Sequence, residues 1–238
     1  MKINLWSGPR NISTAMMYAF AQRKDTTVFD EPLYAHYLSK SPAYEYHPGA
    51  AEVLETQEND GEKVVETLMG NHLTQVAFFK HMAHHLIELE WSFIDKCENV
   101  ILTRNPKEML LSYVQQVATP TLSDVGYDSQ VKILNYLQSK GKKVIVLEAK
   151  QVLLNPRKVL SALCEQLEIP FDENMLKWEA GARKEDGCWA KYWYKSVHKS
   201  TAFAPYKPKT QLFPERLKPL LAECQPYYEQ LEQLAIKA

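Results

Sequence analysis

Five short apolar runs, separated by stretches with the spacing of amphipathic helices, constrain the fold of this chain more than any other feature. The runs lie near residues 3–6, 27–29, 76–79, 100–103 and 144–147. Largely apolar runs of this length are typical of strands buried on both faces, and helices between such strands act as crossovers in a parallel sheet. We therefore predict an α/β fold with a central parallel sheet that helices cover on both sides.

The helices between the strands are marked by their apolar spacing and by their ends. Asn155 followed by Pro156 is a typical helix start, because the Asn side chain can cap the first turn and proline fits the first helical position. The aromatic segment at about 178–210 has no strand pattern, and we expect it to fold over the sheet within a single domain of residues 1–238. Periodicity predicts helices over residues 13–22, 83–95, 106–117, 131–138 and 156–167.

Charge and composition exclude several classes of protein. The 238 residues carry a formal net charge of −1, which argues against non-specific nucleic-acid binding because such binding needs a basic face. No run reaches the roughly 18 apolar residues of a membrane span, and the first residues lack the pattern of a signal peptide. The four cysteines lie far apart without a CxxC pair. We therefore expect reduced thiols and a cytoplasmic protein.

The first predicted strand ends in a loop that suits a phosphate group. Gly8 begins a turn into a helix whose free N–H groups and dipole favour an anion, and Arg10 adds a fixed positive charge. The loop is not a Walker A motif, because the second glycine followed by Lys and Ser or Thr is missing. A plain strand–turn–helix with Ser13 as N-cap is the alternative. The predicted phosphate-binding residues are Gly8, Pro9, Arg10, Asn11, Ile12, Ser13 and Thr14.

A second anion site is predicted at the end of the fourth strand, where Arg104 stands. Pro106 starts the next helix, which places Ser112 about two turns along it. An Arg side chain can grip a phosphate bidentately, and a Ser hydroxyl can add one more hydrogen bond. Arg104 could instead pair with an acid, and Ser112 could face a neighbouring helix. Two such sites at the ends of two strands of one sheet favour the anion-binding interpretation.

With these motifs in this order, residues 3–190 resemble the P-loop-type sulfotransferases, which use 3′-phosphoadenosine 5′-phosphosulfate as the sulfuryl donor. The resemblance implies a P-loop-NTPase-like fold of three layers. It also implies that the first loop cradles the 5′-phosphosulfate of the donor, while Arg104 and Ser112 hold the 3′-phosphate. Residues 147–171 are similar to the fifth strand and the following helix of that family.

Two positions depart from the family pattern. Ile12 stands where the first loop usually has glycine. Arg183 and Lys184 partly match the Arg-Lys-Gly loop that lies over the nucleotide in the family, but Glu185 stands in place of its glycine. The resemblance still implies that Arg183 and Lys184 contact the nucleotide.

The implied reaction is an in-line displacement of the sulfuryl group by a hydroxyl or amine acceptor, without a metal. Arg10 is the candidate that stabilises charge on the leaving group. Branches of the family use either Glu or His as the base. Glu31 and His81 each lie at a strand end, and we prefer Glu31 because of its position beside the phosphate loop. His81 and His85 have a spacing that could share a metal, but no third ligand accompanies them, so no zinc site is expected.

Two other functions stay open at this level. One is a nucleotide-dependent kinase with an unusual loop, although the sequence has no Walker A lysine and no clear magnesium-binding Asp after an apolar strand. The other is a catalytically inactive nucleotide-binding protein on the same fold, which would need neither Glu31 nor His81. The sequence leaves open whether the acceptor is a small molecule or a saccharide, and it does not give the oligomeric state.

Overall fold

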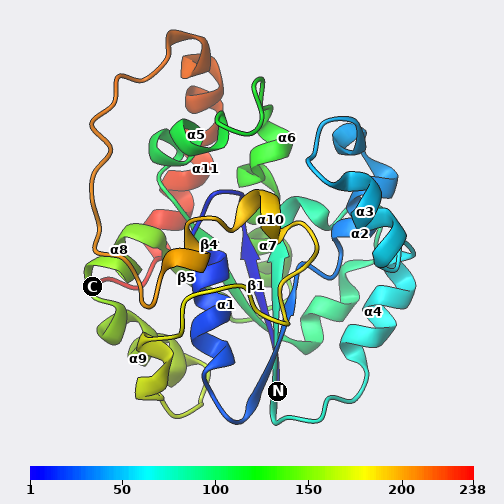
Figure 1. The fold of residues 1–238 in the computed structure, drawn as a ribbon. Coiled ribbons are helices and arrows are strands. Elements are labelled where there is room, and N and C mark those ends of the chain that lie inside the picture. The colour runs from blue at the N-terminus through cyan, green and yellow to red at the C-terminus, as the bar shows by residue number, and fades with distance from the viewer.

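A five-stranded parallel sheet forms the centre of the protein, and the computed structural model describes all 238 residues. The strands pair in the order β2-β3-β1-β4-β5, and every pairing is parallel (Figure 1). Each of the five predicted runs falls on one strand, so the α/β prediction is confirmed. The strands are β1 (Lys2–Ser7), β2 (Thr26–Asp30), β3 (Val76–Met82), β4 (Glu98–Thr103) and β5 (Ile145–Glu148).

Helices connect the strands and cover both faces of the sheet. Three of the predicted helices correspond to α1, α7 and α9, and the Asn155 side chain caps α9 by accepting a hydrogen bond from the backbone N–H of Lys158 (3.1 Å). The helices are α1 (Ser13–Ala21), α2 (Tyr34–Lys40), α3 (Ala50–Thr56), α4 (Gly61–Met69), α5 (Pro106–Tyr113), α6 (Leu122–Val125), α7 (Tyr127–Ser139), α8 (Ala149–Leu154), α9 (Pro156–Gln166), α10 (Ala190–Trp193) and α11 (Lys218–Leu234).

The helix predicted over residues 83–95 is wrong. The chain forms two short 3-10 helices there, Ala83–His85 and Trp91–Lys96, with a bend at Glu88 between them. Leu86 packs on the face of the sheet that α4 and α7 cover, whereas its neighbour Ile87 packs against the separate cluster around α2 and α3. Adjacent side chains that enter two different cores cannot share one helical face, and this overrides the periodicity. The helix predicted to reach residue 117 also ends earlier, at Tyr113.

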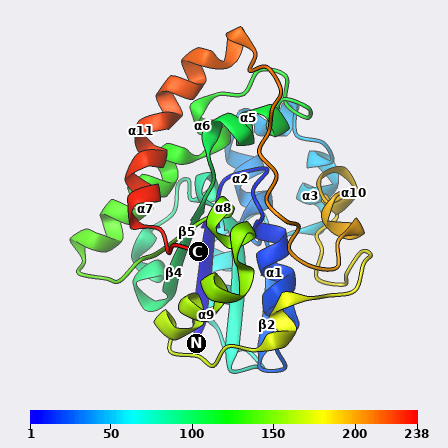
Figure 2. The same ribbon diagram turned by 90° about the vertical axis from the view of Figure 1, so that its left-hand side faces the viewer.

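Alternation along the strands divides the core into two layers. Ile3 and Leu5 of β1 pack on one face with α1 and α9, and Trp6 packs on the other face with α4, α7 and α11. Figure 2 shows α1 on one side of the sheet and α7 with α11 on the other. This α/β/α sandwich is the three-layer arrangement that was expected. The chain ends beside the sheet, where the backbone N–H of Ile236 donates to the Val146 carbonyl oxygen.

The central position of β1 determines where a ligand can bind. Within the sheet, β3 and β2 lie next to β1 toward one edge, and β4 and β5 lie next to it toward the other edge. The loops after β1 and β4 therefore diverge, and a crevice at the carboxyl ends of the strands is the usual ligand site in such sheets. Gly8 lies in the first of these loops, and a Cβ atom there would stand 2.8 Å from the Val125 carbonyl oxygen. The close approach explains the glycine, because a larger residue would push the loop away from α6.

The second loop is held by a helix cap, which gives a first prediction. The Asn105 side chain accepts hydrogen bonds from the backbone N–H groups of Lys107 (3.0 Å) and Glu108 (3.4 Å) at the start of α5. We expect Asn105→Ala to lower the free energy of unfolding by about 1 kcal/mol, because the cap is lost. Asn105→Asp keeps a capping oxygen and is the matched control. Urea titrations of both variants test this, and an equal loss in both would contradict the capping role.

Candidate active site

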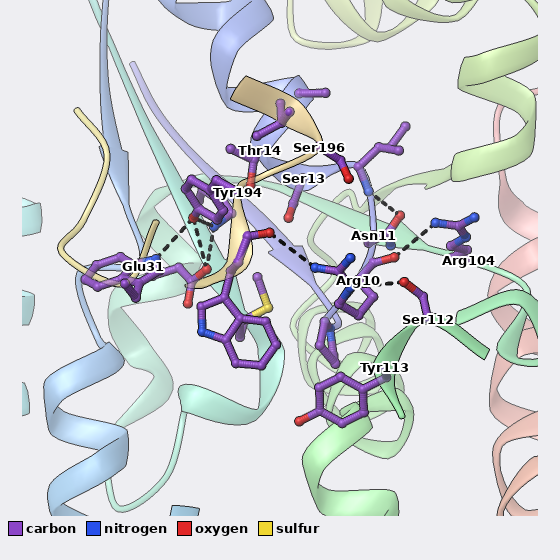
Figure 3. Close-up of a pocket in the computed structure, with 18 of the residues that line it drawn as sticks. Arg10, Asn11, Ser13, Thr14, Glu31, Arg104, Ser112, Tyr113, Tyr194 and Ser196 are labelled. Atoms are coloured by element: carbon purple, nitrogen blue, oxygen red, sulfur yellow. Dashed lines mark hydrogen bonds and ion pairs between the residues drawn. The ribbon is translucent and has the colours of Figure 1, made fainter. Parts of the chain in front are cut away.

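A cavity of about 370 Å³ opens at the carboxyl ends of β1, β2, β3 and β4. Its walls come from the loop between β1 and α1, from the ends of the neighbouring strands, and from α5. The aromatic segment at about 178–210, which contains α10 and is called the late segment below, completes them. Figure 3 shows Arg10, Arg104 and Ser112 at one end of this cavity, Glu31 and Tyr194 at the other, and Ser13 and Thr14 between them. The cavity thus joins residues that are far apart in the sequence.

The loop between β1 and α1 forms the centre of the cavity wall. Residues 9–14 line the cavity, whereas Gly8 does not and instead packs against Val125. Ser13 is not the N-cap: Ile12 holds that position and gives α1 no side-chain cap. The first-turn N–H groups of α1 therefore have no capping oxygen, which suits an anion. Asn11 fastens the loop to β4, because its amide group donates to the Leu102 carbonyl oxygen (2.9 Å).

Arg10, Arg104 and Ser112 lie together at one end of the cavity. Arg10 donates from Nε to the Ser112 hydroxyl (3.1 Å) and from Nη1 to the Trp193 carbonyl oxygen (3.2 Å). Arg104 donates to the backbone carbonyl oxygen of Arg10 (3.0 Å) and pairs with Glu108 (3.2 Å). Burial and then the charge of Arg104 lower the pKa of Arg10. Of the two guanidinium groups only that of Arg104 has a carboxylate partner, so this end of the cavity has an excess of positive charge.

Arg183 and Lys184 do not reach the cavity. The guanidinium group of Arg183 lies over the ring of Tyr18, 4.5 Å from its centroid, and donates to the Glu179 carbonyl oxygen. The Lys184 side chain is 91% exposed and pairs with Glu185. In this structure neither side chain is placed to contact a ligand in the cavity.

A buried cluster of charged side chains forms the opposite end of the cavity. Lys80 is 1% exposed, and its ammonium group donates to Asp30 (2.8 Å), to Glu31 and to the Tyr194 hydroxyl (2.7 Å). An ammonium group has three protons, so all three are used. Tyr194 in turn donates to Asp30, and the indole N–H of Trp189 donates to Tyr194 (3.2 Å). The late segment is therefore tied to the ends of β2 and β3 through this cluster.

Glu31 is buried and is held in a strained backbone conformation. Its φ of 41° is in the left-handed region, and Arg10 across the cavity has a φ of 51°. Residues other than glycine rarely adopt this conformation, and such strain is concentrated at functional sites. Burial raises the pKa of Glu31, Lys80 opposes that rise, and Asp30 adds to it. For Lys80, burial alone would lower the pKa, but Asp30 and Glu31 outweigh it and raise the pKa.

His81 does not line the cavity. Its ring stacks on Trp6 with 4.4 Å between centroids, and its Nε2 lies 3.3 Å from the Asn4 side-chain oxygen. These contacts lie on the face of the sheet that α4 and α7 cover. Burial lowers the pKa of His81 to about 3. Lys80 and Met82, its neighbours on β3, both line the cavity. The alternation of a strand explains this difference, and it could have identified Lys80 from the sequence as the residue that faces the site.

Comparison with known proteins agrees with this geometry. A family model described as a sulfotransferase domain matches residues 1–235. The chain belongs to the sulfotransferase domain family. Its fold is similar to that of the sulfotransferase domain from the Synechococcus PCC 7002 olefin synthase, with a TM-score of 0.55, 15% identity, and coverage of 95% of this chain and 94% of that chain. It is also similar to a sulfotransferase from Alicyclobacillus acidocaldarius, with a TM-score of 0.54, 14% identity, and coverage of 99% and 96%.

A curated relative from Arabidopsis thaliana has a name of a different kind. Branched-chain-amino-acid aminotransferase-like protein 1 is 40% identical over 228 residues, which are 95% of this chain but 40% of that protein. The chain therefore spans less than half the length of this relative. Within the chain, no helix is both long enough and apolar enough to cross a membrane. No three His, Cys, Asp or Glu side chains converge in a way that could hold a metal ion.

The buried cluster gives a second prediction. Lys80→Met leaves Asp30 and Glu31 buried without their cation, so we expect the free energy of unfolding to fall by about 3–5 kcal/mol at pH 8. Without Lys80 the pKa of Glu31 rises further, so the folded variant binds a proton more readily than the unfolded chain does. The deficit should therefore shrink as the pH falls toward 5.

Urea titrations of wild type and variant at both pH values test this prediction. The raised pKa of Lys80 means that its contribution is present below about pH 10 and is lost only above it, so wild type holds it throughout this window. Lys191→Met, which breaks the exposed ion pair with Glu52, is the matched control and should have little effect. A deficit that does not change with pH would contradict the assigned role of the cluster.

Proposed function

We propose that this member of the sulfotransferase family transfers a sulfuryl group from 3′-phosphoadenosine 5′-phosphosulfate to a hydroxyl or amine acceptor. The observation that carries the proposal is one continuous cavity with two positively charged loops at one end and a buried carboxylate of raised pKa at the other. The first end suits a donor with two separate anionic groups. The second end suits the removal of a proton from an acceptor.

Donor binding falls to the two loops beside β1. The uncapped first turn of α1, with the hydroxyls of Ser13 and Thr14, would hold the 5′-phosphosulfate. Arg104 and Ser112, on the other side of β1, would hold the 3′-phosphate. The Arg10 side chain now donates to Ser112, and the Arg104 guanidinium donates to the backbone carbonyl oxygen of Arg10; both guanidinium groups can exchange these bonds for bonds to the donor. Such charge-assisted hydrogen bonds to phosphate are stronger than hydrogen bonds between neutral groups.

The proposed step moves one proton and one sulfuryl group. Glu31 accepts the proton of the acceptor hydroxyl or amine as its oxygen or nitrogen forms a bond to sulfur. The bond between sulfur and the bridging phosphate oxygen breaks, and Arg10 stabilises the charge that develops on that oxygen. The products are the sulfated acceptor and adenosine 3′,5′-bisphosphate, with the proton on Glu31. Lys80 is a positioning residue, because it fixes the Glu31 carboxylate and is itself saturated by three acceptors.

The competing functions have less support. A kinase would need one anion site for a chain of 5′-phosphates, whereas Arg104 and Ser112 would form a second site, after a different strand and on a different helix. An inactive binding protein would have no use for a strained, buried carboxylate beside the cavity. The name of the Arabidopsis relative refers to a protein of which this chain matches 40%, so we do not transfer aminotransferase activity to this chain.

The second anion site gives a third prediction. Adenosine 3′,5′-bisphosphate should bind about 10- to 150-fold more tightly than ADP or AMP, because a charge-assisted bond to its 3′-phosphate contributes roughly 1.5–3 kcal/mol. Arg104→Ala should remove most of this preference and leave AMP affinity nearly unchanged. Arg157→Ala, which changes an exposed arginine of α9, is the control. Calorimetry measures all affinities, and equal binding of ADP and the bisphosphate by wild type would rule out the proposed donor.

The base gives a fourth prediction. Glu31→Gln should lower kcat by about 100- to 10,000-fold, the usual contribution of a general base, while the affinity for adenosine 3′,5′-bisphosphate is kept. His81→Asn should lower kcat far less, because His81 does not line the cavity. In wild type the raised pKa of Glu31 places the acidic limb of the kcat profile above the usual range of a glutamate, and activity falls as the pH drops through it. Near-normal kcat in Glu31→Gln would exclude this residue as the base.

A further inference from the structure

The wall of the cavity beyond Glu31 is made almost entirely of uncharged rings. Tyr34 links its two sides: it stacks on His85 with 5.1 Å between ring centroids, and it meets Trp189 edge-on at 5.2 Å. Aromatic walls of this kind favour a flat ligand, because ring faces and edges pack against one another. The wall residues are Tyr34, His47, Met82, His84, His85 and Trp189.

Charge is scarce at this end of the cavity. Its only charged lining residues are Glu31 and Lys80, and Lys80 is saturated by its three acceptors. The cavity's other positive charges belong to Arg10, Arg104 and Lys209 in the donor region, where Arg104 is paired with Glu108. A carboxylate or sulfate on the acceptor would therefore meet no free cation here. An ammonium group would have to compete with Lys80 for its carboxylates. Burying an unpaired charge is costly, so both kinds of acceptor are disfavoured.

Two histidines in this wall have hydrogen-bonding atoms without partners. His84 and His85 are 5% and 1% exposed, and the Nδ1 atom of each is buried with no partner in the protein. The Nδ1 edge of His84 faces Gly126, because a Cβ atom built on Gly126 would lie 2.9 Å from Nδ1. The Nε2 edge of the ring therefore points away from Gly126. Burial lowers the pKa of His84 to about 3, and burial also lowers that of His85. Both rings are therefore neutral, and each offers one donor and one acceptor.

From this wall we infer that the acceptor is a small uncharged phenol with a second neutral polar group, which His84 and His85 recognise. The inference rests on the proposed function and narrows its acceptor. A phenolic hydroxyl has a pKa near 10, as in tyrosine, so it yields its proton to a buried carboxylate more readily than a sugar hydroxyl does. The aromatic wall packs on the ring, and the imidazoles bind the second polar group.

Four para-substituted phenols test the charge of the acceptor while the reacting hydroxyl stays the same. They are 4-cresol, 4-hydroxybenzyl alcohol, tyramine and 4-hydroxybenzoate, each assayed with 3′-phosphoadenosine 5′-phosphosulfate. We expect kcat/KM for 4-hydroxybenzyl alcohol to exceed that for 4-cresol about 5-fold, the worth of one neutral hydrogen bond. Tyramine and 4-hydroxybenzoate should be about 100-fold poorer than 4-cresol. A charged phenol that equals or exceeds 4-cresol would overturn the inference.

Variants of the two histidines test the recognition of the second polar group. In His84→Phe and His85→Phe the ring is kept and the nitrogens are lost, so the 5-fold preference for 4-hydroxybenzyl alcohol over 4-cresol should fall toward 1. His81→Phe makes the same change at a buried histidine outside the cavity and should keep the preference. Using the ratio of two substrates cancels a general loss of activity. An unchanged ratio in both variants would overturn the assignment, and if neither variant folds, the four phenols on wild type decide.

Failure of the inference can be distinguished from failure of the proposed function. Transfer to glucose or to ethylamine but to none of the phenols would keep the sulfotransferase and overturn the phenol acceptor. Absence of any sulfated product, together with equal affinity for ADP and adenosine 3′,5′-bisphosphate, would overturn both.

Discussion

The ammonium group of Lys80, buried between Asp30 and Glu31, is the interaction on which the rest of the site depends. It joins the carboxyl ends of β2 and β3, and through Tyr194 it ties the late segment to the sheet. Removing either sign of charge from such a buried cluster leaves the other uncompensated, so the three groups stabilise the fold only as a unit. The same burial raises the pKa of Glu31.

The opposite end of the cavity depends on a constraint of topology. Because β1 lies between β3 and β4, its loop and the loop after β4 face one another across a crevice. Asn11 fastens the first loop to β4, and Arg104 binds the backbone of Arg10, so the two loops are held as one body. The spacing of these two loops is therefore set by the sheet itself. The late segment contributes the Trp193 carbonyl oxygen to the same assembly.

The sequence predicts those parts of the molecule that depend on local pattern. The strands, the sheet type and the positions of Arg10 and Arg104 beyond two strand ends follow from the apolar runs. Residues 83–95 could not be predicted, because Leu86 and Ile87 are drawn into two separate cores by contacts distant in the sequence. Lys80 was not predicted as a site residue, although strand alternation places it on the opposite face of β3 from His81. A lysine in an apolar strand can be identified as buried only when both of its carboxylate partners are known.

The central claim is that this chain carries out sulfuryl transfer from a 3′-phosphorylated donor. Its most direct test is mass spectrometry of the purified protein with 3′-phosphoadenosine 5′-phosphosulfate and a mixture of uncharged phenols, sugars and amines, with ATP in a parallel reaction. The account predicts equal amounts of adenosine 3′,5′-bisphosphate and of one sulfated acceptor, and no phosphorylated product from ATP. Phosphorylation of an acceptor by ATP, with no sulfated product from the sulfuryl donor, would contradict it.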